Sequence, residues 1–202
     1  MDDTFTLLPL TIDPATKAIS SLDSSLSSNL TALNTLHRAI LSQPNQIPPP
    51  PLPLNPKRSA QIQKMREQGN ASLRSRGNPS TAQAQEAIKL YTYGIEMALG
   101  RPSWEPAQTV REEAGILYAN RAQAYMAAQM WAEGAADGET SVELKRTDNG
   151  KAWWRRGRCL CEMGRWDDAA EWVRQGLEVA GNEADLAALM KEIDKHLEKG
   201  ER

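Results

Sequence analysis

The chain has 202 residues and a formal net charge of -2, a length that suits one domain of ordinary size with an appendage. The balanced charge gives no basic excess for nucleic acid or for an anionic membrane surface. No run approaches the roughly 20 apolar residues needed to span a bilayer, so direct membrane insertion is not expected. An acidic start and a short apolar run broken by Pro9 also argue against a secretory signal.

Residues 1–43 are rich in Ser, Thr, Asn and Leu, and their apolar side chains recur every three or four positions. This spacing predicts one amphipathic helix with a polar opposite face that is poor in strong helix formers and therefore marginal alone. The apolar stripe consists of Leu22, Leu26, Leu30, Leu33, Leu36 and Ile40. It either packs on the chain's own domain or docks on a separate subunit, and we favour the subunit. Upstream, the mixture of residues from Thr4 to Ile12 favours an extended strand, which Asp13 and Pro14 would end.

Residues 44–56 contain seven prolines and predict an extended spacer, in preference to a site for a proline-recognising partner. From residue 57 onward the pattern is helical, and clusters of Gly, Pro and Asn divide it into helices of about 12 to 20 residues. These breaks lie at 77–79, 100–106, 147–150, 164 and 181–182. The sequence therefore predicts a partner-docking segment at 1–43, a linker at 44–56 and an all-α domain at 57–202.

The helical region repeats itself at a shift of 35 residues, which carries Asn120 to Arg155. The same shift places Trp131 on Trp166, and a further copy with longer loops begins near Gly69. Repeats of this length are typical of stacked helix pairs. Small residues recur where the two helices of a pair would cross closely, at Gly69, Ala122 and Gly157 in the first helices and at Ala87, Gly134 and Ala169 in the second helices.

This pattern resembles the tetratricopeptide repeat family over residues 59–180. The resemblance implies an all-α fold of three stacked helix hairpins followed by a C-terminal capping helix. The last helix is predicted to begin near Asn182, with Asp185 three residues later as in a capping box, and resembles the terminal helix that covers an exposed repeat edge. Departures from the family pattern include Gly138, where an aromatic residue is usual, and a longer link between the first and second copies.

Five polar residues lie at fixed offsets on the first helices of the three predicted hairpins. They are Arg66, Asn70, Asn120, Lys151 and Arg155. Residues four apart share one face of a helix, so these side chains can converge on the concave surface and offer three cations and two amides to an anion. Together they resemble the carboxylate clamp of chaperone-binding tetratricopeptide domains, which implies binding of a C-terminal Glu-Glu-Val-Asp tail. Arg66 replaces a usual lysine.

Some of these residues also have an ordinary structural explanation. Basic residues are common on solvated helix faces, but two asparagines without a capping role are unusual there. Leu73, one turn beyond Asn70, either lines an adjoining apolar pocket or belongs to the core. The tryptophans at 153, 154, 166 and 172 are expected to fill repeat interfaces. We expect no metal site, no cofactor and no catalytic machinery, because His37 and His196 are isolated and no nucleophile and base are paired.

The combination of leucine stripe, proline-rich spacer and one clamp domain resembles the small tetratricopeptide subunits of fungal Sec translocation complexes. This resemblance implies an adaptor at the cytosolic face of the endoplasmic reticulum membrane, held peripherally by a membrane-anchored Sec subunit. Its partner would be a heat-shock chaperone of the seventy-kilodalton class, delivering precursors for post-translational import. One alternative is a soluble co-chaperone adaptor. A chaperone-recruited enzyme is disfavoured because no residues are left over for a catalytic domain.

Overall fold

The computed structural model describes residues 8–42, 56–74, 79–102, 105–181 and 183–200. Two compact units separate by their internal contacts, one formed mainly by the N-terminal residues up to Leu54 and the other by the helices that follow. The predicted proline-rich linker lies outside the described residues except for Pro56, which is the first residue of helix α2. Proline suits this position because its missing N–H would have no partner in the first turn.

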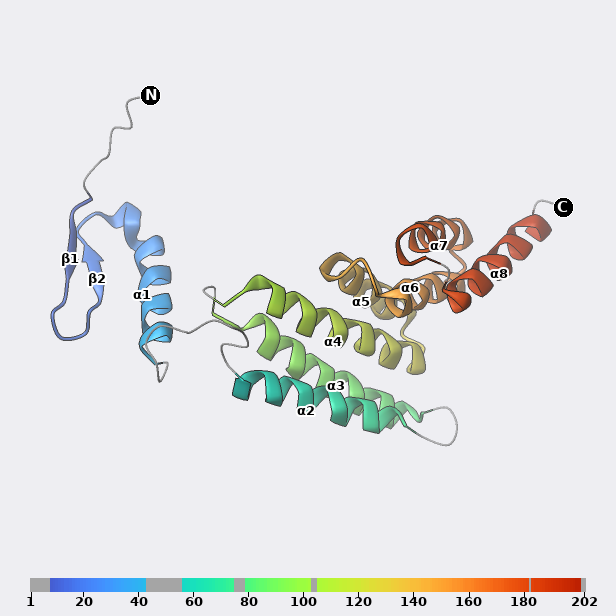
Figure 1. The fold of residues 1–202 in the computed structure, drawn as a ribbon, viewed down its shortest axis with the longest axis horizontal. Coiled ribbons are helices and arrows are strands. Elements are labelled where there is room, and N and C mark those ends of the chain that lie inside the picture. The colour runs from blue at the N-terminus through green and yellow to red at the C-terminus, as the bar shows by residue number, and fades with distance from the viewer. Residues whose placement is uncertain (1–7, 43–55, 75–78, 103–104, 182, 201–202) are drawn as a thin grey trace, which may run out of the picture. The chain divides into compact units, whose positions relative to one another are not determined.

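The N-terminal unit consists of a small hairpin and one helix (Figure 1). Strands β1 (Leu10–Ile12) and β2 (Ile19–Ser21) pair antiparallel, and the 3₁₀ turn η1 (Ser24–Leu26) leads into α1 (Ser27–Leu41). The Asn34 side chain joins α1 to the hairpin, since its amide donates to the Ile19 carbonyl at 2.7 Å and accepts from the Ile19 N–H at 2.8 Å. No described residue of 8–42 is fully buried.

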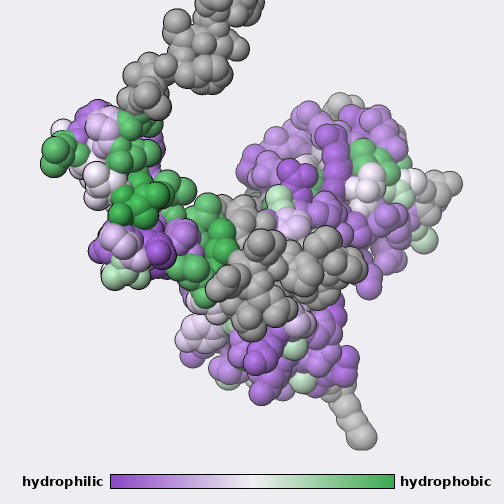
Figure 2. Space-filling view, turned by 60° about the vertical axis from the view of Figure 1, so that its left-hand side comes forward, coloured by the Kyte–Doolittle hydropathy of each residue, from purple (hydrophilic) through white to green (hydrophobic). Residues whose placement is uncertain are grey.

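This unit differs in two respects from the expectation. The predicted strand has a partner, β2, that the sequence pattern does not reveal. The apolar stripe also does not begin on the helix, because Leu22 precedes η1 and is fully exposed. Of the remaining stripe residues, Leu33 is exposed, whereas the others are half-buried. Figure 2 shows hydrophobic surface on this unit.

The second unit is an all-α stack of helix hairpins, as predicted (Figure 1). Its helices are α2 (Pro56–Leu73), α3 (Thr81–Leu99), α4 (Ala107–Ala127), α5 (Trp131–Leu144), α6 (Gly150–Glu162), α7 (Trp166–Ala180) and α8 (Ala184–Gly200). Each helix contacts the next, and α2, α4, α6 and α8 also contact one another in sequence. The first helices of the hairpins therefore lie side by side, and α8 occupies the place of a further first helix.

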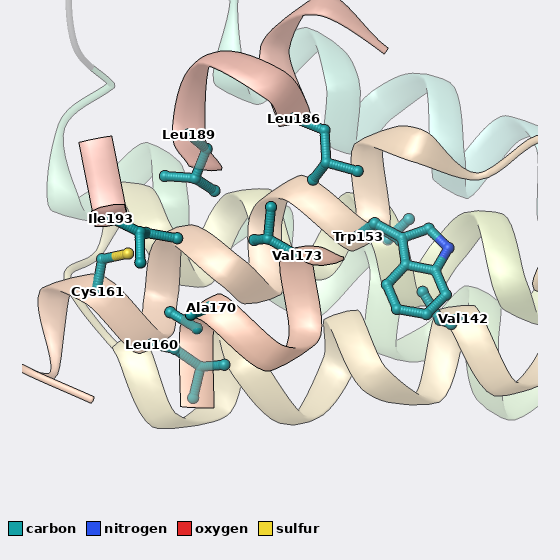
Figure 3. Close-up of a cluster of buried hydrophobic side chains, with 12 residues drawn as sticks. Val142, Trp153, Leu160, Cys161, Ala170, Val173, Leu186, Leu189 and Ile193 are labelled. Carbon is teal, nitrogen blue, oxygen red and sulfur yellow. The ribbon is translucent and has the colours of Figure 1, made fainter. Parts of the chain in front are cut away.

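Helix α8 covers one end of the core, as a capping helix should. Leu186, Leu189 and Ile193 are buried against Trp153 and Val173 (Figure 3). The predicted cap Asn182 lies outside the described residues. Close helix crossings explain two of the glycines, since a Cβ at Gly157 would meet Val173 at 2.6 Å and one at Gly69 would meet the Tyr91 ring at 2.5 Å.

Turns between the helices follow local sequence chemistry. Ser80 and Gln83 form the capping box that starts α3. Gly164 joins α6 to α7 with a φ of 73°, a left-handed conformation that glycine adopts without cost. Gln129 occupies the same repeat position between α4 and α5 and adopts a φ of 58°. Because this turn has neither glycine nor proline, the sequence does not predict a break there.

Candidate functional site

The five predicted clamp residues lie on three first helices that stand next to one another. Arg66 and Asn70 lie on α2, Asn120 on α4, and Lys151 and Arg155 on α6. Their spacing of four residues within α2 and within α6 places each pair on one helix face. The helices therefore bring residues from three parts of the chain to one surface formed by α2, α4 and α6, which we call the groove.

Two amides of the groove are joined directly. The Nδ2 of Asn120 donates to the Oδ1 of Asn70 at 3.3 Å, and the hydroxyl of Tyr91 on α3 donates to the same oxygen at 2.7 Å. Tyr91 is fully buried, and burial raises the pKa of its phenol to about 12 although Arg155 and Arg66 oppose the shift. Both arginines therefore lie near this hydroxyl, and four predicted residues gather around Tyr91.

The cations of the groove have no acidic partner among the described residues. Arg155 donates to the Ala119 carbonyl at 2.7 Å and to the Gln123 side-chain oxygen at 3.1 Å, both of which are neutral. Burial lowers the pKa of its guanidinium, yet arginine stays charged near neutral pH. The Nε of Arg66 is buried and has no hydrogen-bond partner in the described part of the chain. A desolvated charge without a counter-ion is costly, so this site favours an incoming anion.

The arginines that directly follow Asn120 and Arg155 in the sequence do have acidic partners. Arg121 forms two hydrogen bonds to the Asp137 carboxylate at 2.7 and 2.8 Å. Arg156 forms an ion pair with Glu139, and its guanidinium lies 4.4 Å from the centroid of the Trp172 ring. These contacts place Arg121 between α4 and α5, and Arg156 between α6 and the second helices α5 and α7.

Lys151 lies at the edge of the groove and is exposed. With Arg155, Gln123 and Trp154 it lines a pocket of about 260 Å³, whose other walls include Glu183, just before α8, and Asp185 in the first turn of α8. No described acid lies within ion-pair distance of Lys151, but these two carboxylates moderate the positive charge at this end. The five predicted residues therefore share one surface, with Lys151 more peripheral than the others.

Leu73 lines a neighbouring pocket of about 770 Å³. The pocket continues the groove from α2 across α4 to α6 and has Met126, Trp154 and Arg158 among its other walls. Leu73 also packs against the buried cluster around Tyr91, so it belongs to the core and to the pocket at once. An apolar side chain next to a bound carboxylate would find a place here.

Sequence reasoning missed three residues that line this surface or support it from behind. Tyr91 occupies a core position of the repeat, and only the need of a buried hydroxyl for a partner could have revealed its role. Gln123 follows Asn120 by three positions on the same face, which was a usable signal. Trp154 was assigned to a repeat interface, but it is half-buried and also lines the groove pockets.

Other reactive side chains of the described chain are built into its packing. Both cysteines are free thiols that are buried, and His196 stacks on Trp166 with ring centroids 3.7 Å apart. No group of three or more His, Cys, Asp or Glu residues in the described ranges could hold a metal ion. None of the described helices is both long and apolar enough to cross a membrane.

No family model matches the chain, but a known protein is similar to it over most of its length. The chain is 34% identical over 144 residues to the ER protein translocation subcomplex subunit sec67 of Schizosaccharomyces pombe, covering 70% of this chain and 71% of that protein.

Solved structures share the fold. A chain in the cryo-EM structure of the Sec complex from S. cerevisiae matches with a TM-score of 0.62 and 22% identity, covering 94% of this chain and 98% of that one. The second tetratricopeptide domain of human RPAP3, in complex with the HSP70 peptide SGPTIEEVD, matches with a TM-score of 0.53 and 21% identity, covering 68% and 98%. The hairpin stack is thus a tetratricopeptide fold, and the identity to sec67 over most of both sequences shows that the chain belongs to the sec67 family of endoplasmic reticulum translocation subunits.

Proposed function

We propose that the chain is an adaptor subunit that binds the C-terminal Glu-Glu-Val-Asp tail of a cytosolic chaperone of the seventy-kilodalton class. The binding residues are Arg66, Asn70, Asn120, Lys151 and Arg155. The adaptor docks the chaperone at the endoplasmic reticulum translocon for post-translational import. It acts by binding and not by catalysis.

One observation carries this proposal. The groove holds three cations that have no described acidic partner, around two joined asparagines, whereas Arg121 and Arg156 next to them are paired with acids. A C-terminal carboxylate supplies the missing negative charge and accepts hydrogen bonds from guanidinium and amide groups. Membership of the sec67 family and the fold shared with a domain that holds an HSP70 tail peptide support it.

The test is a calorimetric titration of the full chain with a peptide ending in Glu-Glu-Val-Asp. We expect micromolar affinity, which corresponds to about -8 kcal/mol. The matched control is the same peptide with an amidated C-terminus, which should lose most of its binding because amidation removes the terminal charge. Equal affinity for the acid and the amide would refute the clamp.

The N-terminal segment carries the second part of the proposal. Residues 1–43 dock on a membrane-anchored Sec subunit, residues 44–56 form the linker, and 57–202 form the peptide-binding domain. Support comes from the apolar stripe on a unit in which no described residue is fully buried, with Leu22 and Leu33 exposed. Exposed apolar surface of this kind marks an interaction site.

Deleting residues 1–43 should release the protein from membranes and leave peptide affinity within about twofold, since none of the five clamp residues is removed. Membrane fractionation and the same titration measure the two effects separately. A truncated protein that still sediments with membranes would favour another anchor. If the intact protein is soluble and absent from Sec complexes pulled down from solubilised membranes, the soluble co-chaperone adaptor is the better description.

A further inference from the structure

Tyr91 stands at the meeting point of the groove residues without facing the groove itself. Its ring is fully buried between α2 and α3, where a Cβ on Gly69 would meet it at 2.5 Å. Only its hydroxyl reaches the polar residues, and it donates to the Oδ1 of Asn70 at 2.7 Å. A phenol placed in this way acts on a ligand only through the residue that it touches.

The surroundings of this hydroxyl fix the direction of its hydrogen bond. Arg66, Arg155 and the Nδ2 of Asn120 are donors, so the Oδ1 of Asn70 is the acceptor within reach of the phenol. Burial raises the pKa of Tyr91 to about 12, which keeps the proton on the oxygen at neutral pH. The hydroxyl therefore remains a donor under physiological conditions.

This arrangement determines which end of the Asn70 amide is available. An asparagine can present either its oxygen or its nitrogen to a ligand by rotating its amide. Here the Oδ1 accepts from both Tyr91 and Asn120, while the Nδ2 of Asn70 has no acceptor among the described residues. The nitrogen is thus the free end, and a carboxylate needs a donor.

We infer that Tyr91 is a positioning residue, whose hydroxyl holds the Asn70 amide with its Nδ2 directed to the carboxylate of a bound peptide. Without the hydroxyl, Asn70 could turn its oxygen toward the anion and repel it. This inference rests on the proposed function and extends it to a residue that lies behind the binding surface.

The test compares four full-length variants with the wild type in titrations with a fluorescent peptide ending in Glu-Glu-Val-Asp. Tyr91→Phe removes only the hydroxyl and should weaken binding about fivefold, the loss of one neutral hydrogen bond. Asn70→Ala should weaken binding about tenfold or more, and the double variant should bind as Asn70→Ala does, within twofold. Tyr93→Phe is the control, because it removes an exposed hydroxyl from the same helix and should bind as the wild type does.

A second measurement applies even if Tyr91→Phe is unstable in thermal melts. In ¹⁵N-labelled wild-type protein, the side-chain amide signal of Asn70, identified by its absence in Asn70→Ala, should shift when peptide is added. An unshifted signal overturns the inference. So does a Tyr91→Phe affinity equal to that of the wild type, or a loss that adds in full to that of Asn70→Ala, because a merely structural hydroxyl would act independently of Asn70. If the wild type binds no peptide, the proposed function fails and the role of Tyr91 fails with it.

Discussion

The hairpins α4–α5 and α6–α7 share one repeat pattern but use it differently. At the groove position the first has Asn120, whose amide bonds to Asn70, and the second has Arg155, whose charge has no described acidic partner. At the next position both have an arginine, Arg121 and Arg156, and each pairs with an acid of a second helix. Both acids lie on α5, so Arg121 pairs within its own hairpin and Arg156 pairs with the preceding one. The position between helices thus keeps its arginine from copy to copy, whereas the groove position changes from an amide to a cation.

The largest expected effect is on packing within the second of these hairpins. Gly157→Ala introduces a methyl group that meets Val173 at 2.6 Å, whereas the equivalent residue in the first hairpin is already Ala122. Overpacking of this kind should lower the free energy of unfolding by about 2 to 3 kcal/mol. The control is Gly115→Ala, where the nearest atom lies at 3.6 Å and the change should be neutral or stabilising. Urea denaturation measures both, and similar results for the two variants would contradict the crossing geometry.

The next largest expected effect is the loss of peptide affinity when the cation of Arg155 is removed from the groove. Arg155→Ala should weaken binding of a Glu-Glu-Val-Asp peptide about 30-fold, or roughly 2 kcal/mol, because one charge-assisted contact is lost. The salt dependence of binding should weaken as well. Calorimetric titration at two salt concentrations measures both changes, with circular dichroism to confirm that the variant is folded. Unchanged affinity would place the ligand elsewhere.

Arg156→Ala separates charge from position, since Arg156 is adjacent in sequence but faces α5 and α7. Peptide affinity should stay within about threefold of the wild type, because only screened long-range attraction is lost. The free energy of unfolding should fall by about 1 kcal/mol through the lost contact with Trp172. Titration and thermal melts report the two quantities. A loss of affinity equal to that of Arg155→Ala would indicate general basic attraction instead of a defined site.

The smallest expected effect is a change in stability caused by substitutions in the turns between helices. Gln129 and Gly164 occupy the same repeat position, and both have a positive φ. A side chain in this conformation is strained, so Gln129→Gly should stabilise the protein by about 0.5 to 1 kcal/mol. The reciprocal variant Gly164→Gln should destabilise it by a similar amount, as measured by thermal melts. A destabilising Gln129→Gly would mean that side-chain contacts of Gln129 outweigh the backbone strain.

Regular spacing explains how far the sequence predicted the fold. Apolar residues at helical intervals and a repeat shift of 35 residues predicted stacked helix pairs, and the resemblance to tetratricopeptide repeats added the capping role of the last helix. The turn at Gln129 was missed because it contains no helix breaker. The strand partner of β1 was missed because three-residue strands carry little pattern.

Only the residues of the candidate site that lie on exposed helix faces could be predicted, for a related reason. Residues on exposed helix faces, such as Asn120 and Arg155, can be aligned through the repeat, and the structure places them on one surface. Their binding role remains a prediction. Tyr91 could not be found in this way, because its position in the repeat indicates a core residue and its hydrogen bond to Asn70 depends on how two helices cross. Contacts between the two helices of a hairpin depend on tertiary structure, which the spacing of residues along the sequence does not reveal.

The two buried cysteines of α6 have a practical consequence. Burial raises the pKa of the Cys159 thiol to about 12 and that of Cys161 to about 11, so almost no thiolate exists in the folded protein at neutral pH. Thiol reagents attack the thiolate and need access to it, so they should modify either cysteine only when its surroundings open. Cys159 lies against Gly134 of α5, whereas Cys161 belongs to the buried cluster with α7 and α8. The rates of native-state labelling at the two thiols therefore report local opening on the two sides of α6 separately.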